Sequence, residues 1–221
     1  MIIREDNRSK IEALISEFKG AKAYTLDDAS DDELVENTFK KIKDENGKID
    51  GIVHAIANAN TEDLHNEFIM TSKEGYSHAV DASSYSLVVA SRVAKELDML
   101  NDGASIVTLT YLGSTKVLEG YNVMGVAKAA LESSVRYLAS NLGKDGIRVN
   151  AVSAGPIKTL SARGIKNFSS IQTIVEEKAP LHRNVTNIQI GNVVTFLLSD
   201  MSDAITGEII YSDSGYNIMG V

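Results

Sequence analysis

Two residues, Tyr121 and Lys128, have the type and the spacing that could do carbonyl chemistry. Seven residues of helix turn through about 700°, so the two side chains would lie on one face, two turns apart. A phenol near an ammonium can donate a hydrogen bond or a proton to a carbonyl oxygen, and the ammonium can hold hydroxyl or phosphate groups. By itself the pair is common, and a helix with a solvated lysine explains it more simply.

Short apolar runs alternate with longer amphipathic stretches along the chain. We expect strands at 21–26, 49–56, 104–109, 147–152 and 208–211, and helices at 9–18, 31–43, 85–100, 123–142 and 187–199. Nearly continuous apolar strands between helices indicate a parallel sheet covered on both faces, whose ligands bind beyond the carboxyl ends of the strands. The predicted fold class is α/β, a Rossmann-like doubly wound parallel sheet, in a single domain over residues 1–221.

The composition excludes several classes of protein. With 22 Lys and Arg against 30 Asp and Glu, the net charge of -8 gives no basic face for nucleic acid. The absence of Cys excludes disulfides and thiolate chemistry, and the absence of a long apolar run predicts no membrane span. We therefore expect a cytoplasmic protein. The histidines show no metal-binding pattern, so no metal site is predicted at His54, His65, His78 or His182.

Three stretches, 110–113, 121–132 and 147–162, resemble the enoyl-acyl-carrier-protein reductases of bacterial fatty-acid synthesis. These enzymes are a divergent branch of the short-chain dehydrogenase/reductase superfamily. Further matches lie at 81–86, 198–202, 206–208 and 213–215, so the resemblance runs from about Ser9 to the C-terminus. The gap of six residues between Tyr121 and Lys128 is typical of this branch, whereas ordinary superfamily members have a gap of three.

The resemblance implies an oxidoreductase that transfers hydride from NADH to the trans-2 double bond of an enoyl thioester, with NADPH not excluded. The partner would be acyl carrier protein bearing the thioester, and the enzyme would be a homotetramer with the helices near 85–100 and 123–142 at its interface. By position, Tyr121 would hydrogen-bond the thioester carbonyl and Lys128 would hold the nicotinamide ribose. Tyr111 would be a second active-site tyrosine, near the acyl chain.

Other positions match contacts that the family makes with cofactor and substrate. Asp28 and Ala29 would lie beside the adenine, Ile56 would line the adenosine side, and Ala59 would contact the substrate. The segment that would meet the carboxamide and pyrophosphate comprises Ile157, Lys158, Thr159, Leu160 and Ser161. Without the resemblance, the carboxylate of Asp28 would be interpreted as a helix cap or a turn.

The sequence departs from the family at its start. Family members begin with a strand, a Gly-rich turn and a helix that hold the pyrophosphate, whereas the first glycine here is Gly20. Residues 1–3 would match the family's second strand, so the first strand-helix unit is absent from this sequence. We expect either further residues upstream of Met1 or a rearrangement that fills the gap. The alternatives to this reductase are a catalytically silent scaffold and a reductase of another carbonyl; the six-residue gap disfavours the second.

Overall fold

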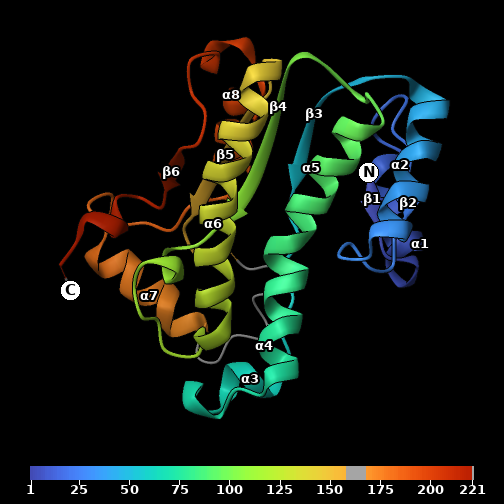
Figure 1. Ribbon diagram of the computed structural model, residues 1–221. Coiled ribbons are helices and arrows are strands. Elements are labelled where there is room, and N and C mark those ends of the chain that lie inside the picture. The colour runs from blue at the N-terminus through green and yellow to red at the C-terminus, as the bar shows by residue number, and fades with distance from the viewer. Residues whose placement is uncertain (158–167, 221) are drawn as a thin grey trace.

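The computed structural model of the chain describes residues 1–157 and 168–220. Its largest sheet has four parallel strands in the order β3-β4-β5-β6 (Figure 1). These are β3 (Ile49–His54), β4 (Leu100–Thr110), β5 (Arg148–Ala154) and β6 (Ile209–Ser212). In the register of the sheet, Thr108 of β4 lies between His54 and Ala151. The parallel direction of all four strands confirms the sheet that the apolar runs predict.

Helices pack on both faces of this sheet. The helices are α1 (Arg8–Ile15), α2 (Asp32–Asn46), α3 (Thr61–His65), α4 (Lys73–Val80), α5 (Ser86–Glu96), α6 (Asn122–Leu142), α7 (Phe168–Lys178) and α8 (Asn187–Leu198). In Figure 1, α5 and α6 stand side by side in front of the strands, and α8 lies behind them. A π-helical turn, Asp81–Tyr85, joins α4 to α5. In this turn the hydroxyl oxygen of Ser84 lies 3.3 Å from the hydroxyl oxygen of Ser134 on α6.

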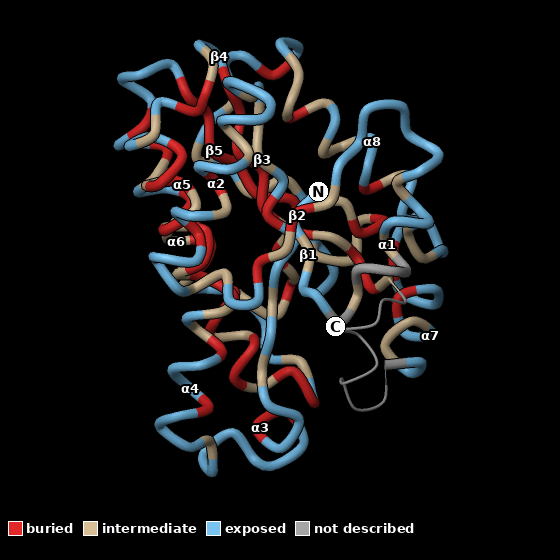
Figure 2. Tube along the Cα trace, turned by 90° about the vertical axis from the view of Figure 1, so that its right-hand side faces the viewer, coloured by how far each residue is buried: buried red, intermediate tan, exposed pale blue. Residues whose placement is uncertain are grey.

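Alternate residues of the central strands fill two separate cores. Ile106 of β4 belongs to the larger core with Leu131 of α6, whereas its neighbour Val107 packs with Leu197 of α8. All four side chains are fully buried. Figure 2 shows that buried residues concentrate along the central strands and the helices packed on them. A strand buried on both faces is the reason that its sequence is almost continuously apolar.

The first two strands form a separate small sheet. β1 (Ile2–Ile3) pairs in parallel with β2 (Tyr24–Thr25). Within 1–157 and 168–220, no strand joins this pair to β3. Val53, the second-last residue of β3, is 50% exposed. The described strands therefore form two separate parallel sheets.

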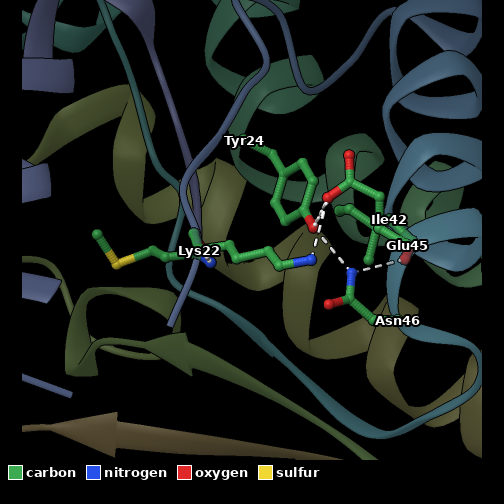
Figure 3. Close-up of polar contacts among 6 residues, drawn as sticks. Lys22, Tyr24, Ile42, Glu45 and Asn46 are labelled. Atoms are coloured by element: carbon green, nitrogen blue, oxygen red, sulfur yellow. Dashed lines mark hydrogen bonds and ion pairs between the residues drawn. The ribbon is translucent and has the colours of Figure 1, made fainter. Parts of the chain in front are cut away.

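A polar network attaches the small sheet to α2 (Figure 3). The hydroxyl of Tyr24 donates to Glu45 at 2.9 Å and accepts from the amide of Asn46 at 2.8 Å. Lys22 reaches the same Glu45 oxygen at 3.2 Å. Because Lys22 and Glu45 are exposed, solvent screens their attraction, and the network fixes the orientation of β2 more than it stabilises the fold.

Several element boundaries differ from those predicted. The helix predicted over 85–100 ends at Glu96, because Asp98 adopts a positive φ of 47° and Leu100 already belongs to β4. The strand predicted over 21–26 is reduced to Tyr24–Thr25. Helices α3, α4 and α7 lie in segments for which no element was predicted. No helix in the described part of the chain has the length and apolar character of a membrane span.

Candidate active site

Segments that follow β3 and β4 meet the first turns of α6. Tyr111 comes directly after β4, Ala59 lies in the segment after β3, and Tyr121 is the residue before α6. Tyr121 and Met124 belong to one buried cluster, against which Tyr111 and Ala59 pack. The structure thus brings together three residues predicted from the sequence, at the edge of the sheet where ligands of such folds bind.

The two tyrosines contact each other edge to face. Their ring centroids are 5.0 Å apart and their planes meet at 69°. Burial raises the pKa of Tyr111 to about 12, with Tyr216 and Asp213 adding to the effect. Burial also raises the pKa of Tyr121 well above its ordinary value, with smaller contributions from Tyr111 and Glu132. Both phenols therefore carry their proton at neutral pH and can donate hydrogen bonds.

Gly113 makes room for the ring of Tyr121, and Gly125 makes room for Gly113. A Cβ atom at Gly113 would lie 2.3 Å from Cδ1 of Tyr121, much closer than real Cβ atoms approach a neighbour. A Cβ atom at Gly125 would lie 2.7 Å from the carbonyl oxygen of Gly113. The turn that contains Gly113 therefore packs directly on α6, and this packing fixes where the hydroxyl of Tyr121 can point.

Lys128 lies two turns along α6 from Tyr121 and is only 6% exposed. Its Nζ donates to the carbonyl oxygen of Leu109 at 2.8 Å. Burial lowers the pKa of Lys128 to about 8, against an opposing contribution from Glu132. An ammonium has three N–H donors, and within the described residues the carbonyl of Leu109 is the one acceptor recorded for it. Two donors remain for a ligand.

Sequence reasoning missed His54, which the structure places in a buried network. Its Nδ1 lies 2.8 Å from the hydroxyl of Thr108, and its Nε2 lies 2.8 Å from the hydroxyl of Ser86. Burial, together with a smaller contribution from the charge of Lys128, lowers the pKa of His54 to about 3. His54 is therefore neutral at physiological pH. Its position at the end of β3 was the signal that could have marked it.

Glu132 is a second buried residue that the sequence reasoning missed. It lies one turn beyond Lys128 on the same face of α6 and is 6% exposed. The hydroxyl of Thr110, the last residue of β4, donates to Glu132 Oε1 at 2.7 Å. The spacing of four residues from Lys128 was visible in the sequence, but the partner on β4 was not.

The residues predicted to contact the cofactor are more dispersed. The exposed Asp28 follows β2, and its Oδ1 accepts from both the backbone and the hydroxyl of Ser30, at 2.8 and 2.6 Å. Hydrogen bonding to Ser30 lowers the pKa of Asp28. These two hydrogen bonds are those of a turn carboxylate, which is the structural interpretation of Asp28 that does not need a cofactor. Ala29 packs against the larger core, and Ile56, 38% exposed, follows β3.

The last predicted cofactor segment follows β5. Ile157 packs against the smaller core, next to Val152 and Ile190. Gly155, two residues earlier, is closely approached, since a Cβ atom there would lie 3.1 Å from Cα of Asp213. Lys158, Thr159, Leu160 and Ser161 lie outside the described residues. Ile157 is thus the described member of this segment, at the carboxyl end of its strand.

An open pocket of about 440 Å³ borders Tyr121. Its lining includes Phe68, Leu118 and Val126, and the backbone turn at Gly113. Most of this lining is apolar, so a hydrocarbon chain would suit it better than a charged ligand would.

A parallel sheet covered on both faces, with a tyrosine and a lysine on one helix at the carboxyl ends of its strands, defines a Rossmann-like reductase. The family of enoyl-(acyl carrier protein) reductases matches residues 1–217. The chain belongs to this family.

Individual relatives agree with the family match. An enoyl-acyl-carrier-protein reductase (NADPH) FabI of Staphylococcus aureus is 48% identical over 216 residues, which cover 97% of this chain and 83% of that protein. The corresponding NADH enzyme of Bacillus cereus is 47% identical over 211 residues, covering 95% and 82%.

Solved structures show the same fold. The crystal structure of the Bacillus cereus enoyl-acyl carrier protein reductase with NADP+ and indole naphthyridinone superposes with a TM-score of 0.93 at 45% identity. The Aquifex aeolicus enoyl-[acyl-carrier-protein] reductase (NADH) gives a TM-score of 0.94 at 40% identity. Each comparison covers 100% of this chain and 85% of the other chain.

Proposed function

We propose that this protein reduces the trans-2 double bond of enoyl thioesters carried on acyl carrier protein, in fatty-acid synthesis. The observation that carries the proposal is the placement of protonated Tyr121 against Tyr111, on the same helix as the buried ammonium of Lys128. The comparisons give no support to a catalytically silent scaffold. They match the chain to reductases along nearly its whole length.

The described residues fit a nicotinamide dinucleotide at two points. The two remaining donors of Lys128 suit ribose hydroxyls, because a buried ammonium needs acceptors to offset the loss of its hydration. At the other point, both recorded bonds of Asp28 go to Oδ1, which leaves Oδ2 to accept from an adenine amine. When bound, the reduced dinucleotide supplies the hydride. Relatives named for NADH and for NADPH both occur, so we propose NADH and include NADPH.

Each polar residue then has a defined task. As hydride is added to the β carbon, an electron pair would move toward the thioester oxygen, and the hydroxyl of Tyr121 would donate a hydrogen bond to that oxygen. A donor already held in position by packing stabilises the developing charge without rearranging. Lys128 adds a positive charge and orients the ribose. Tyr111 packs on Tyr121, and Ala59 packs against the same cluster; in this proposal both would border the acyl chain.

We extend the assignment to the remaining positions as part of the proposal. Asp28 and Ala29 would meet the adenine, Ile56 the adenosine, and Ile157 the nicotinamide side. Lys158, Thr159, Leu160 and Ser161 would continue this last contact. Asp28, Ile56 and Ile157 follow β2, β3 and β5, and this dispersion supports the assignment, since an extended dinucleotide lies across several strand ends.

We further propose a homotetramer in the cytoplasm, with α5 and α6 at the interface. Exposed side chains on these helices include Tyr137, which is 73% exposed in the single chain. Light scattering should give four times the chain mass. A monomer would contradict the tetramer without affecting the proposed reaction.

The proposed function is tested by adding NADH to the protein and following its fluorescence, and then adding crotonyl-coenzyme A and following the loss of NADH absorbance. We expect binding and turnover. Binding without turnover would contradict the assigned reaction, and no binding of NADH or NADPH would favour the scaffold.

A further inference from the structure

Two ionisable side chains of α6, Lys128 and Glu132, are buried against the end of β4. Both are only 6% exposed. Nζ of Lys128 donates to the carbonyl of Leu109, and Thr110, the next residue, donates to the carboxylate of Glu132. The two charged groups are therefore attached to consecutive residues of one strand. The residue that follows them on the chain is Tyr111.

A buried carboxylate is costly unless charges and hydrogen bonds compensate for its lost hydration. Among the described residues, the hydroxyl of Thr110 is the one hydrogen-bond donor recorded for Glu132. Positive charge is one source of further compensation, and Lys128 lies one helical turn away on the same face. A buried carboxylate is not needed to fill the core at this position, because an apolar side chain would pack there without the loss of hydration.

The charge of Glu132 acts on both proton donors of the site. It raises the pKa of Lys128, against the larger effect of burial, and it contributes to the raised pKa of Tyr121. Each shift favours the form that carries the proton. The other titratable groups near Lys128 do not compete between pH 5.5 and 9.5, because His54 stays neutral and Tyr111 stays protonated. Asp213 acts on Tyr111, whose pKa it raises.

We propose that Glu132 is a positioning residue of the reductase site, which keeps Lys128 charged and Tyr121 protonated and ties the end of β4 to α6. The inference rests on the proposed reductase function and adds to it a residue that touches neither substrate nor cofactor. Glu132 acts through its charge and through its hydrogen bond with Thr110. Glu132 forms and breaks no bond during the reaction.

The test is the pH profile of kcat/KM for NADH, which reports groups of the free enzyme, with crotonyl-coenzyme A saturating. In the wild type, activity should decline above about pH 8 as Lys128 loses its proton. Glu132→Gln keeps the size of the side chain and an acceptor for Thr110 but removes the charge. In this variant the decline should begin about one pH unit lower than in the wild type. Its kcat/KM should therefore be about tenfold below that of the wild type at pH 8.5 and within about twofold of it at pH 6.

Two further variants separate this role from a structural one. Glu132→Asp keeps the negative charge but, with a shorter side chain, holds it closer to the backbone of α6. The pH at which its kcat/KM declines should therefore lie between those of the wild type and Glu132→Gln. Glu96→Gln removes an exposed charge from the last turn of α5 and should leave the profile unchanged. Circular dichroism checks the fold of each variant. If Glu132→Gln does not fold, the profile of Glu132→Asp decides in the same way.

The inference would be overturned if the pH profile of Glu132→Gln superposed on that of the wild type, or if kcat/KM fell by the same factor at all pH values. If Glu132→Gln does not fold, the same two outcomes are judged on Glu132→Asp. Neither result affects the proposed function. That function fails separately, if the wild type itself does not oxidise NADH in the presence of crotonyl-coenzyme A.

Discussion

The rings of Tyr111 and Tyr121 meet edge to face, with their centroids 5.0 Å apart, although the two residues belong to different elements. Tyr111 directly follows the strand β4, and Tyr121 directly precedes α6. Aromatic pairs in this geometry add about 0.5–1.5 kcal/mol beyond the area that they bury. The contact holds the strand end and the helix start in a fixed relation, and the phenol of Tyr121 depends on both.

Gly113→Ala should move the ring of Tyr121 and impair catalysis. The new Cβ would lie 2.3 Å from Cδ1 of Tyr121, so the ring must shift, and a donor misplaced by an ångström loses much of its effect. We expect kcat to fall by about tenfold to a hundredfold, measured as NADH oxidation with crotonyl-coenzyme A. Gly143→Ala is the matched control, since the φ of Gly143 is −59° and, among the described residues, no atom beyond its chain neighbours and local helix backbone lies within 4 Å of the new Cβ. Equal activity of the two variants would contradict the packing account.

His54→Gln should change how stability depends on pH. In the wild type, the pKa of His54 is about 3 in the folded protein and about 6.5 in the unfolded chain. Between these values the unfolded chain binds one proton more, so the free energy of unfolding falls as pH falls, by up to about 1.4 kcal/mol per unit. In the variant, the free energy of unfolding should lack this dependence on pH between pH 6.5 and 4.5. Urea titrations at a series of pH values measure it.

The exposed His78 provides the control for that experiment. His78→Gln should retain the full slope of the wild type. If His54→Gln retained it as well, His54 would not be the buried neutral group that the contacts with Thr108 and Ser86 describe.

Lys128→Met should separate binding from stability. The pKa of Lys128 is about 8 in the folded protein and about 10.5 in the unfolded chain, so between these values the unfolded chain again binds one proton more. The stability of the wild type should therefore gain up to about 1.4 kcal/mol per unit as pH rises from 8 to 9.5, and the variant should lack this gain. At pH 7 the variant should bind NADH at least about tenfold more weakly, because an ammonium hydrogen bond of about 1.5–3 kcal/mol is lost. Unchanged affinity would contradict the role assigned to Lys128.

The sequence was most informative where local pattern decides structure. The strands of the main sheet were predicted because burial on both faces makes their sequences continuously apolar, as for Ile106 and Val107. Tyr121 and Lys128 were placed on one helix by spacing alone. The α/β class and the family follow from these features and are confirmed by the relatives and the solved structures.

The long-range contacts of the site could not be predicted in the same way. His54 appeared isolated because its partners, Thr108 and Ser86, are 54 and 32 residues away. Glu132 meets Thr110 across 22 residues, and only the folded sheet brings them together. The short helix α3, of 5 residues, has too few turns for an apolar period to be recognised. The roles assigned to individual residues stay predictions until variants are measured.

The hydroxyl of Tyr121 is the centre of the account, and Tyr121→Phe tests it most directly because it removes one oxygen atom and keeps the ring against Tyr111. The rate of NADH oxidation with crotonyl-coenzyme A should fall by about a hundredfold to a thousandfold. NADH binding, followed by fluorescence, should stay within about twofold of the wild type, since Lys128 is untouched. Undiminished turnover in this variant would contradict the assignment of Tyr121 as the donor to the thioester oxygen.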